Sequence, residues 1–256
     1  MTVMVEQGRD DRAAVDKAID LLSSFGGHTK AGLGVSELAR RSSMSKSTAF
    51  RLLGVLERNG VVERVGSNYR LGARLHSLGI QVYTPEGERL RDLLTPFLAD
   101  LYELTHETVH LAMLDGPDVV YLAKLFGHRP VPSPSKVGGR VPAHRTAVGK
   151  ALLAFDPAAT DLIASMPLTG LTPFTLTDHG ALLKELAAVR QDGIAFDRQE
   201  ARIGLTCVAA PVFGPSGVPI AGLSVSGATG RFVPAEHAVA LRRVSLAASQ
   251  RVRRAR

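Results

Sequence analysis

The sequence predicts a two-domain α+β protein, a small helix-rich domain followed by a larger domain in which strands alternate with helices. Its 256 residues are enough for two ordinary domains, each with its own core. Positive charge is concentrated early, because residues 36–74 hold eight Lys or Arg and three Asp or Glu within a formal net charge of +7. We place the small domain at 9–72, a connecting helix at 73–84 and the larger domain at 85–256.

Regular structure is predicted to begin with a helix at residues 13–25. Val15, Ala18, Ile19 and Leu22 recur there at helical spacing. We expect this helix to pack beneath the elements that follow.

Residues 35–71 predict a winged helix-turn-helix: two short helices joined by a turn, then a hairpin. Ser36 is the expected N-cap of the first helix, which runs to Arg41. The hairpin has its turn at 66–68. It carries Asn68 and Arg70, which we predict to contact DNA as the wing.

The second helix of this motif is predicted to begin at Ser45 and to end at about Arg58. Asn59 and Gly60 follow, and both tolerate the left-handed conformation that ends many helices. At 100° per residue the helix has two distinct sides. The apolar side holds Ala49, Leu52, Leu53 and Leu56, and the opposite side holds Ser47, Arg51, Gly54 and Arg58.

The polar side of this helix suits insertion into a DNA major groove, where Arg can hydrogen-bond guanine. Ser47, Thr48 and Arg51 are the candidates for reading bases. Lys46 is the candidate for holding a phosphate, and Ser45 joins this surface at the helix start. A solvated face on an ordinary amphipathic helix would look similar, but the order helix, turn, helix, hairpin favours DNA binding.

The larger domain is predicted as a sheet of mixed direction with helices between its strands. A long helix from Pro85 to about Thr105 either covers this sheet or provides dimer contacts. The later elements expected are a hairpin at 109–125, a loop at 127–142, a helix from 143, a helix at 178–191, a strand at 194–196, an uncharged hairpin within 203–230 and a helix from Pro234.

Composition excludes several classes of protein. A single cysteine, Cys207, excludes an intrachain disulfide and a multi-cysteine zinc site, which fits a cytoplasmic protein. The N-terminal residues are polar and charged, so no secretory signal is predicted. Residues 203–230 carry no charge, but their three prolines and six glycines exclude a membrane helix.

The uncharged hairpin predicts a binding face. If residues 214–217 form a four-residue loop, counting back places Cys207 opposite Ser224 and Leu205 opposite Ser226. Cys207, Ser224 and Ser226 then share one face. Two hydroxyls and a thiol on a concave sheet face can receive a carboxylate through hydrogen bonds.

Two strings in the larger domain resemble the IclR family of bacterial transcriptional regulators. They are GRVPAHRTAVGKALLAF, residues 139–155, and VRQDGIAFDRQEARIGLTCVAAPVFGPSGVPIAGLSVSG, residues 189–227. With the winged helix, the likeness spans nearly the whole chain. It implies a linker helix, a GAF-like effector-binding domain, and dimers or dimers of dimers on inverted-repeat operator DNA. The family's effectors are mostly small organic acids or aromatic metabolites.

The resemblance also implies further site residues. Matching the family's motif places Asp197, Ala147 and Val148 in the effector site, and Glu200 completes a D-x-x-E pattern. Arg145 stands where the family commonly has alanine, so its role stays open between pairing with an anionic ligand and lying on the surface.

Alternative functions are a hydrolase and a ligand-binding module with a basic appendage. HETVH, residues 106–110, matches a zinc-protease motif, but that motif needs a helix and these residues lead into an alternating strand pattern. A nucleophilic Cys207 would need a base, for which His144 is the candidate. We therefore predict a DNA-binding regulator of repressor type, with no catalytic residues, metal or cofactor.

Overall fold

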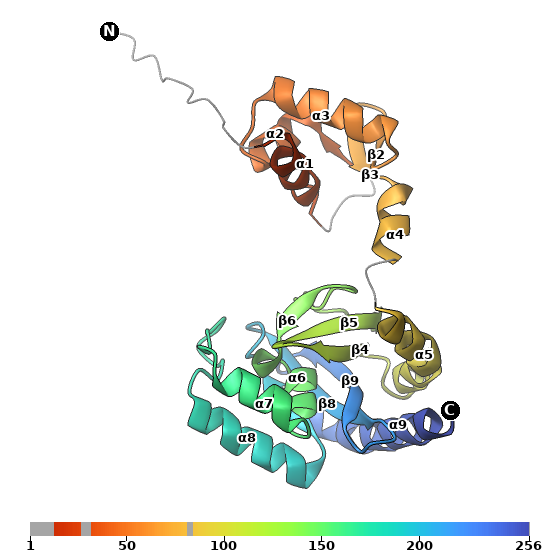
Figure 1. Cartoon of the computed structure of the whole chain (residues 1–256), viewed down its shortest axis with the longest axis vertical. Helices are drawn as coiled ribbons and strands as arrows, with labels where there is room; N and C mark the ends of the chain where they lie inside the picture. The colour runs from red at the N-terminus through yellow and green to blue at the C-terminus, as the bar shows by residue number, and fades with distance from the viewer. Residues whose placement is uncertain (1–12, 27–31, 81–83, 256) are drawn as a thin grey trace. The chain divides into compact units, whose positions relative to one another are not determined.

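The computed structural model describes residues 13–26, 32–80 and 84–255 (Figure 1). It contains two compact units, Met1–Val82 and Tyr83–Arg256. No helix among the described residues is long and apolar enough to cross a membrane.

The N-terminal unit is a winged helix-turn-helix with a small core of apolar side chains. Its elements are α1 (Ala14–Ser23), β1 (Leu33–Gly34), α2 (Val35–Arg41), α3 (Lys46–Arg58), β2 (Val62–Val65), β3 (Asn68–Leu71) and α4 (Ala73–Ile80). Leu21 of α1, Leu38 of α2 and Leu53 of α3 are fully buried together. These helices therefore hold one another through the apolar positions that the helical spacing predicts.

The ends of α3 follow from single residues. Ser45 is its N-cap, and the Ser45 side chain accepts a hydrogen bond from the Thr48 amide. Gly60, just past the end, has a φ of +66°, which favours glycine. The predicted helix from Ser45 to Arg58 is confirmed.

The start of α2 and the wing differ from the prediction. Gly34, not Ser36, is the N-cap of α2, because residues 33 and 34 form the extra strand β1 and keep the chain extended up to that point. The sheet therefore has three strands in the order β1-β3-β2. Asn68 pairs with Val65, so the wing turn contains only Gly66 and Ser67, and Asn68 already belongs to β3.

The C-terminal unit is built on a six-stranded sheet in the order β6-β5-β4-β9-β8-β7. Its strands are β4 (Thr108–Asp115), β5 (Asp118–Leu125), β6 (Arg140–Pro142), β7 (Ala195–Arg198), β8 (Leu205–Phe213) and β9 (Pro219–Ala228). Neighbouring strands are antiparallel throughout. The expectation of a mixed sheet was wrong, because β8 and β9 return as a hairpin to the middle of the sheet.

Helices cover both faces of this sheet (Figure 1). On one face α5 (Pro85–Thr105) and α9 (Pro234–Arg254) pack on the apolar side chains of the central strands. On the other lie α6 (Ala147–Leu153) and α8 (His179–Asp192). A strand buried on both faces has no solvated side for charged residues, which explains the uncharged stretch at 203–230.

The β8–β9 hairpin pairs two residues away from the predicted register. Its loop is one residue longer than expected, since Phe213 pairs with Pro219, and a bulge beside Val212 adds a second shift. Cys207 therefore faces Ser226, and Ser224 faces Ala209. Side chains alternate with a period of two, so a two-residue shift left Cys207, Ser224 and Ser226 on the same face.

The sequence analysis did not predict two short elements of the C-terminal unit, β6 and α7. The expected loop at 127–142 ends in the edge strand β6, which pairs with β5. Helix α7 (Pro157–Ala164) packs beside α6, with Asp156 as N-cap and Pro157 at its first position. An acidic cap followed by proline is a local signal that could have identified this helix.

Gly149, in α6, tests the close packing of this layer. A Cβ added there would overlap the carbonyl oxygen of Ala143, which cannot move freely. We expect Gly149→Ala to lower the unfolding free energy of the C-terminal unit by about 3 kcal/mol in urea titrations. Gly79→Ala in α4 has no heavy atom within 4 Å of the added Cβ and is the control, expected to be neutral or slightly stabilising. Equal unfolding curves for the two variants would contradict the packing argument.

Candidate functional sites

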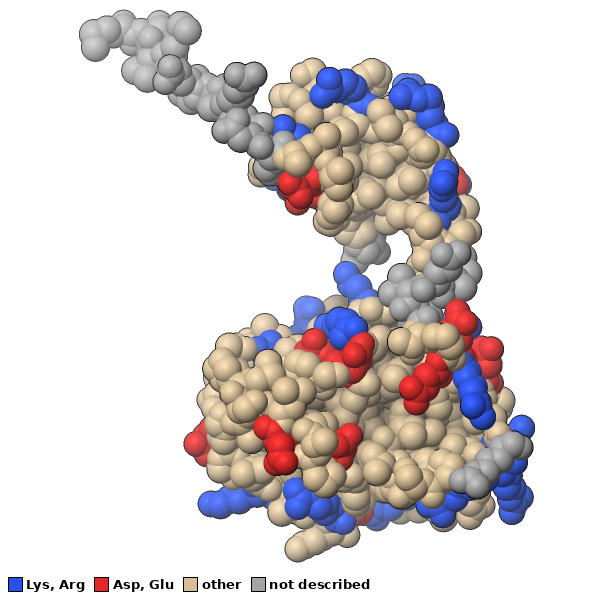
Figure 2. Space-filling model, in the orientation of Figure 1, with Lys and Arg blue, Asp and Glu red and all other residues tan. Residues whose placement is uncertain are grey.

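The outer side of α3 carries the predicted DNA-binding residues. Lys46, Ser47, Arg51 and Arg58 are exposed there, while Ala49 and Leu53 are buried on the opposite side. Figure 2 shows basic side chains along the edge of the N-terminal unit where α3 lies in Figure 1. Within the described residues, none of the three cations on α3 has an ion-pair partner. Their charges are therefore available to an external anion.

The hydroxyls at the start of α3 form a cap network. Ser45 Oγ lies 2.8 Å from Thr48 Oγ1 and 3.1 Å from Ser47 Oγ. Ser45 acts mainly as the helix cap, and the network holds the Ser47 and Thr48 side chains at the exposed N-terminal turn. A helix N-terminus with oriented hydroxyls favours anionic groups such as phosphate.

The wing residues are less free than those of α3. Arg70 makes an ion pair with Glu63, its cross-strand neighbour, at 2.7 Å. Both side chains are largely exposed, so the pair adds little stability and a phosphate can displace it. Asn68 is half-buried at the first residue of β3.

The predicted effector residues line one cavity in the C-terminal unit. Ala147 and Val148 come from α6, Asp197 from β7, Cys207 from β8, and Ser224 and Ser226 from β9. The sheet register explains this convergence: Asp197 pairs with Cys207, and Cys207 pairs with Ser226. These three side chains therefore form one row across neighbouring strands.

Residues that sequence reasoning missed complete the wall. His110 and Tyr121 project from β4 and β5, Ser133 and Ser135 from the loop before β6, and Thr146 caps α6. His110 is the direct neighbour of Ser224 on β9. The pairing of β4 with β9 joins segments about a hundred residues apart in the sequence, so no local pattern signals it.

The cavity is small and adjoins a larger pocket. Its volume is about 20 Å³, enough for roughly one water molecule. An open pocket of about 440 Å³ lies beside it, lined in part by Leu171, Arg202 and Ile203. Both spaces share Ser133, Pro134 and Ala201, which form the wall between them.

The acidic groups of the cavity are perturbed by burial. Burial raises the pKa of Asp197 to about 7, although the Glu200 amide donates to its Oδ1 at 2.6 Å. Burial also raises the pKa of the Cys207 thiol well above its usual value, and the neighbouring Asp197 adds to this effect. Near neutral pH the cavity is therefore weakly charged, and Cys207 is a neutral thiol.

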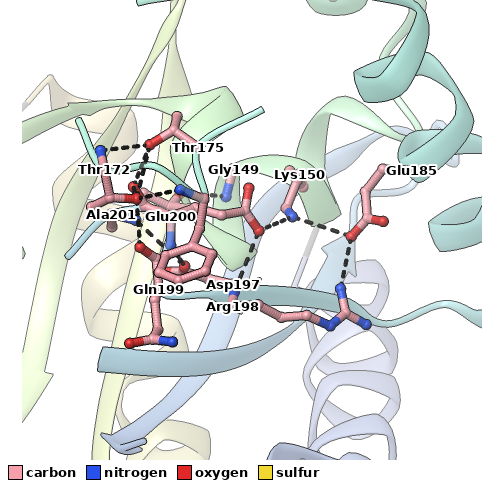
Figure 3. A network of polar contacts seen from close by, with 12 residues as sticks. Gly149, Lys150, Thr172, Thr175, Glu185, Asp197, Arg198, Gln199, Glu200 and Ala201 are labelled. Atoms are coloured by element: carbon pink, nitrogen blue, oxygen red, sulfur yellow. Dashed lines mark hydrogen bonds and ion pairs between the residues drawn. The ribbon is translucent and has the colours of Figure 1, made fainter. Parts of the chain in front are cut away.

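A buried ion pair holds the segment that carries Asp197 (Figure 3). Lys150 is fully buried, and its Nζ lies 2.7 Å from Glu200 Oε1 and 3.1 Å from Glu185 Oε1. Glu200 does not line the cavity; it pairs with Lys150 behind it. In the D-x-x-E pattern, Asp197 faces the cavity and Glu200 anchors the turn.

The far side of the same turn is also anchored. Thr172 Oγ1 donates to the Gln199 carbonyl at 2.8 Å, and Thr175 Oγ1 donates to the Glu200 carbonyl at 2.8 Å. Gln199 has a φ of +68°, which an L side chain rarely adopts. The surrounding hydrogen bonds compensate for this strain and hold the turn in one conformation.

Comparison with known proteins identifies the family. The model for the IclR helix-turn-helix domain matches residues 14–66, and the model for the bacterial transcriptional regulator IclR C-terminal domain matches residues 86–253. The chain belongs to the IclR family. It is a DNA-binding transcriptional regulator with an effector-binding C-terminal domain, and not an enzyme.

Its relatives cover almost the whole chain. The HTH-type regulator XynR of Escherichia coli is 33% identical over 227 residues, 87% of this chain and 89% of that protein. IclR of Thermotoga maritima has a TM-score of 0.76 and 33% identity, covering 94% of this chain and 97% of that one. An IclR homologue from Microbacterium hydrocarbonoxydans, solved with 4-hydroxybenzoate, has a TM-score of 0.72 and 27% identity, covering 94% and 99%.

The hydrolase alternatives disagree with both family and geometry. His106 ends α5 in a left-handed conformation, and His110 lies inside β4, so HETVH places its histidines on different elements. Among the described residues no group of three metal-ligating side chains comes together. His144 Nε2 lies 3.3 Å from the Thr169 carbonyl oxygen and does not line the cavity that holds Cys207.

Arg145, the departure from the IclR pattern, has a structural partner. Its Nε donates to the Thr169 carbonyl at 2.9 Å, and its Nη2 bonds the Thr169 hydroxyl. Arg145 does not line the cavity. It ties the 3-10 turn Ala143–Arg145, which precedes α6, to the loop before α8, and Leu171 and Thr172 of that loop line the open pocket.

The buried ion pair predicts a large stability effect. Lys150→Met leaves Glu200 buried without its counter-charge, so we expect the C-terminal unit to lose about 3–5 kcal/mol in denaturant titrations. Arg198→Met is the control: it removes an exposed contact of 3.5 Å with Glu185 and a cation–π contact of 5.0 Å with the Phe196 ring, and we expect a loss below about 1 kcal/mol. A small loss for Lys150→Met would show that the pair does not anchor the turn.

Proposed function

We propose that this regulator is a repressor whose operator affinity changes when a small organic or aromatic acid occupies the C-terminal cavity. The observation that carries the proposal is the exposed surface of α3, where Lys46, Arg51 and Arg58 lack intramolecular ion pairs among the described residues. The repressor AllR of Escherichia coli, 33% identical over 203 residues, supports the direction of regulation.

On the DNA side, α3 is the recognition helix. Ser47, Thr48 and Arg51 contact base edges, with Arg51 donating to guanine, and Lys46 contacts a phosphate. Ser45 orients the first turn through its cap network. Asn68 and Arg70 reach the backbone from the wing once a phosphate replaces Glu63 at Arg70.

On the effector side, the inner cavity receives the acidic group of the ligand. Cys207, Ser224, Ser226 and Asp197 supply polar contacts, while Ala147 and Val148 bring the first turn of α6 against the ligand. The Microbacterium hydrocarbonoxydans relative with bound 4-hydroxybenzoate supports an aromatic acid of this size. A ring does not fit in about 20 Å³, so the shared wall at Ser133 and Pro134 moves toward the open pocket on binding.

We also infer a homodimer, or a dimer of dimers, acting on inverted-repeat operators in the cytoplasm. A two-fold assembly places two α3 helices on half-sites of matching spacing. Effector binding then changes how the C-terminal units pair and so changes the spacing of the two recognition helices. This coupling requires the effector to bind the two arrangements with different affinity.

The direct test uses fluorescence anisotropy to measure how the protein binds a DNA fragment from the region upstream of its own gene. We expect specific binding that weakens with salt, and an affinity that shifts when 4-hydroxybenzoate or another small organic acid is added. A thermal-shift screen of such acids identifies which one stabilises the chain. Failure to bind the fragment at low salt would refute the regulatory proposal, and equal affinities across the panel would refute the coupling.

Arg51 tests the recognition surface. Arg51→Ala is expected to weaken operator binding by about tenfold or more and to reduce discrimination at one base pair. Lys184→Ala removes an exposed positive charge from α8 and serves as the control, with operator affinity unchanged. If both variants bound the operator like the unaltered protein, α3 would not be the recognition helix.

Asp197 predicts a pH dependence. With a pKa of about 7, its carboxyl loses a proton as the pH rises from 6 to 8, and the new charge repels an anionic ligand. We expect the dissociation constant for 4-hydroxybenzoate, or for the acid found in the screen, to rise about tenfold over this range. Asp197→Asn should abolish this pH dependence. An equally steep dependence in that variant would show that another group causes it.

The same carboxyl links pH to stability. The pKa of Asp197 is raised in the folded chain relative to its ordinary value of 3.8, so the contribution of the neutral form is complete below about pH 4. That contribution is lost as the pH rises through 7. Unfolding titrations of Asp197→Asn, which cannot ionise, should show a smaller decline in stability between pH 5 and 8.

A further inference from the structure

A lysine lies immediately behind the cavity wall. Lys124 is half-buried on β5, and its ammonium donates three hydrogen bonds: to Ser133 Oγ at 2.8 Å, to the Ser135 carbonyl at 3.0 Å and to Ser135 Oγ at 3.2 Å. No carboxylate among the described residues pairs with it. The ammonium therefore contacts neutral groups: three oxygens of the cavity-lining Ser133 and Ser135, and the Phe126 ring, whose centroid lies 4.7 Å from Nζ.

Hydrogen bonds continue from this lysine into the cavity. Ser135 Oγ lies 2.8 Å from His110 Nε2, and His110 Nδ1 lies 3.3 Å from Ser224 Oγ. The strand pairing brings these residues together: His110 on β4 lies opposite Lys124 on β5 and opposite Ser224 on β9. The Tyr121 ring packs edge-on against His110 at 5.4 Å and restricts the tilt of the imidazole.

The positive charge of Lys124 determines which atom donates in each of these hydrogen bonds. An ammonium can only donate, so Ser135 Oγ accepts from Lys124. Burial, followed by the charge of Lys124, lowers the pKa of His110 to about 3, so its imidazole is neutral and carries one donor and one acceptor. The lone pair of the imidazole is favoured at Nε2, toward the ammonium, because an N–H there would point toward a positive charge. Ser135 Oγ also lies 2.7 Å from Ser133 Oγ. With its single proton directed to Nε2, Ser135 accepts from both Ser133 and Lys124, and Nδ1–H donates to Ser224.

This direction leaves the Ser224 proton without a protein acceptor among the residues that the structure describes. Ser224 Oγ accepts from His110, so its own O–H is available to a group inside the cavity. Ser226 differs, because its hydroxyl donates to the Thr108 carbonyl at 3.4 Å. Ser224 and Ser226 lie on one face of the sheet but differ in role. Ser224 can donate to a ligand, whereas Ser226 donates to the protein backbone.

We propose that Lys124, Ser135 and His110 form a relay that presents the Ser224 hydroxyl as a donor, and so selects a carboxylate oxygen at the inner end of the cavity. Lys124, Ser135 and His110 are positioning residues in this arrangement, and Ser224 contacts the ligand. The proposal rests on the effector role of the cavity. A carboxylate there also supplies a negative charge to balance Lys124, across two serines, Ser135 and Ser224, and the imidazole between them.

The first test needs no ligand. In the full chain labelled with ¹⁵N-histidine, long-range proton–nitrogen spectra report which imidazole nitrogen carries the proton, and His110 is assigned by its absence from His110→Asn. We expect His110 as the neutral Nδ1–H tautomer across pH 5–8. Ser135→Ala removes the donor to Nε2, so the population should shift toward Nε2–H. Ser165→Ala is the control, because Ser165 is exposed at the end of α7 and does not line the cavity, and it should match the unaltered protein. An Nε2–H tautomer in the unaltered protein, or no change in Ser135→Ala, would overturn the proposal.

The second test measures the recognition itself. Formate is the smallest carboxylate, and formamide is its neutral analogue with the same number of heavy atoms, so both require the same small displacement of the cavity wall. We expect the unaltered protein and Ser165→Ala to bind formate more tightly than formamide, and Ser135→Ala to lose roughly fivefold of that preference. No preference in the unaltered protein would overturn the selection of a carboxylate. Operator binding is measured separately, so a chain that prefers formate but never responds on DNA would contradict only the regulatory proposal.

Discussion

Burial on both faces of the six-stranded sheet is the constraint on which the C-terminal unit depends. Apolar side chains fill the α5–α9 face, and α6 and α8 cover the other, so a polar group on a central strand has no access to bulk water. Such a group must be paired within the protein or with a ligand, since an unpaired buried polar group destabilises the fold. Five polar side chains of β4, β7, β8 and β9 line one small cavity: His110, Asp197, Cys207, Ser224 and Ser226.

The same constraint explains why charge behind the cavity is so closely paired. Lys150 lies in a helix whose other residues are all buried, and its ammonium is tolerated only because Glu200 and Glu185 face it. Pairing with Glu200 places the turn after β7, and that turn directs Asp197 into the cavity. Among the described residues, no cation lies as close to Asp197. Because no ion pair offsets its burial, the pKa of Asp197 is raised. The pH-dependent anion binding that we propose therefore depends on Lys150 pairing with Glu200 and not with Asp197.

In the N-terminal unit, by contrast, several cations lie at the surface and some of them have no ion-pair partner among the described residues. Arg40, Arg41 and Arg70 are each paired with a glutamate of the same unit, whereas Arg51 and Lys46 of α3 remain unpaired within the described part of the chain. Exposed cations without intramolecular partners lose little by contacting a phosphate or a guanine, because no ion pair is broken. The unpaired cations of α3 therefore support the proposal that this helix contacts DNA.

Local periodicity alone determined much of this protein. The limits of α3, the apolar positions of α5 and the hairpin that carries Cys207, Ser224 and Ser226 follow from patterns within a few turns or one strand pair. Even a wrong loop length preserved the shared face, because a shift of two residues leaves the alternation unchanged. Family likeness added Asp197, Ala147 and Val148, which periodicity does not reveal.

Tertiary structure decided which of these segments meet. The neighbourhood of His110 and Ser224 depends on β4 lying beside β9, and the pairing of Lys150 with Glu200 joins a helix to a distant turn. Strand order and burial arise from the packing of the whole sheet, and similar local sequences are compatible with other orders. For that reason the sequence could indicate which side chains share a strand face, but only the folded chain shows that a lysine, a serine and a histidine converge behind Ser224.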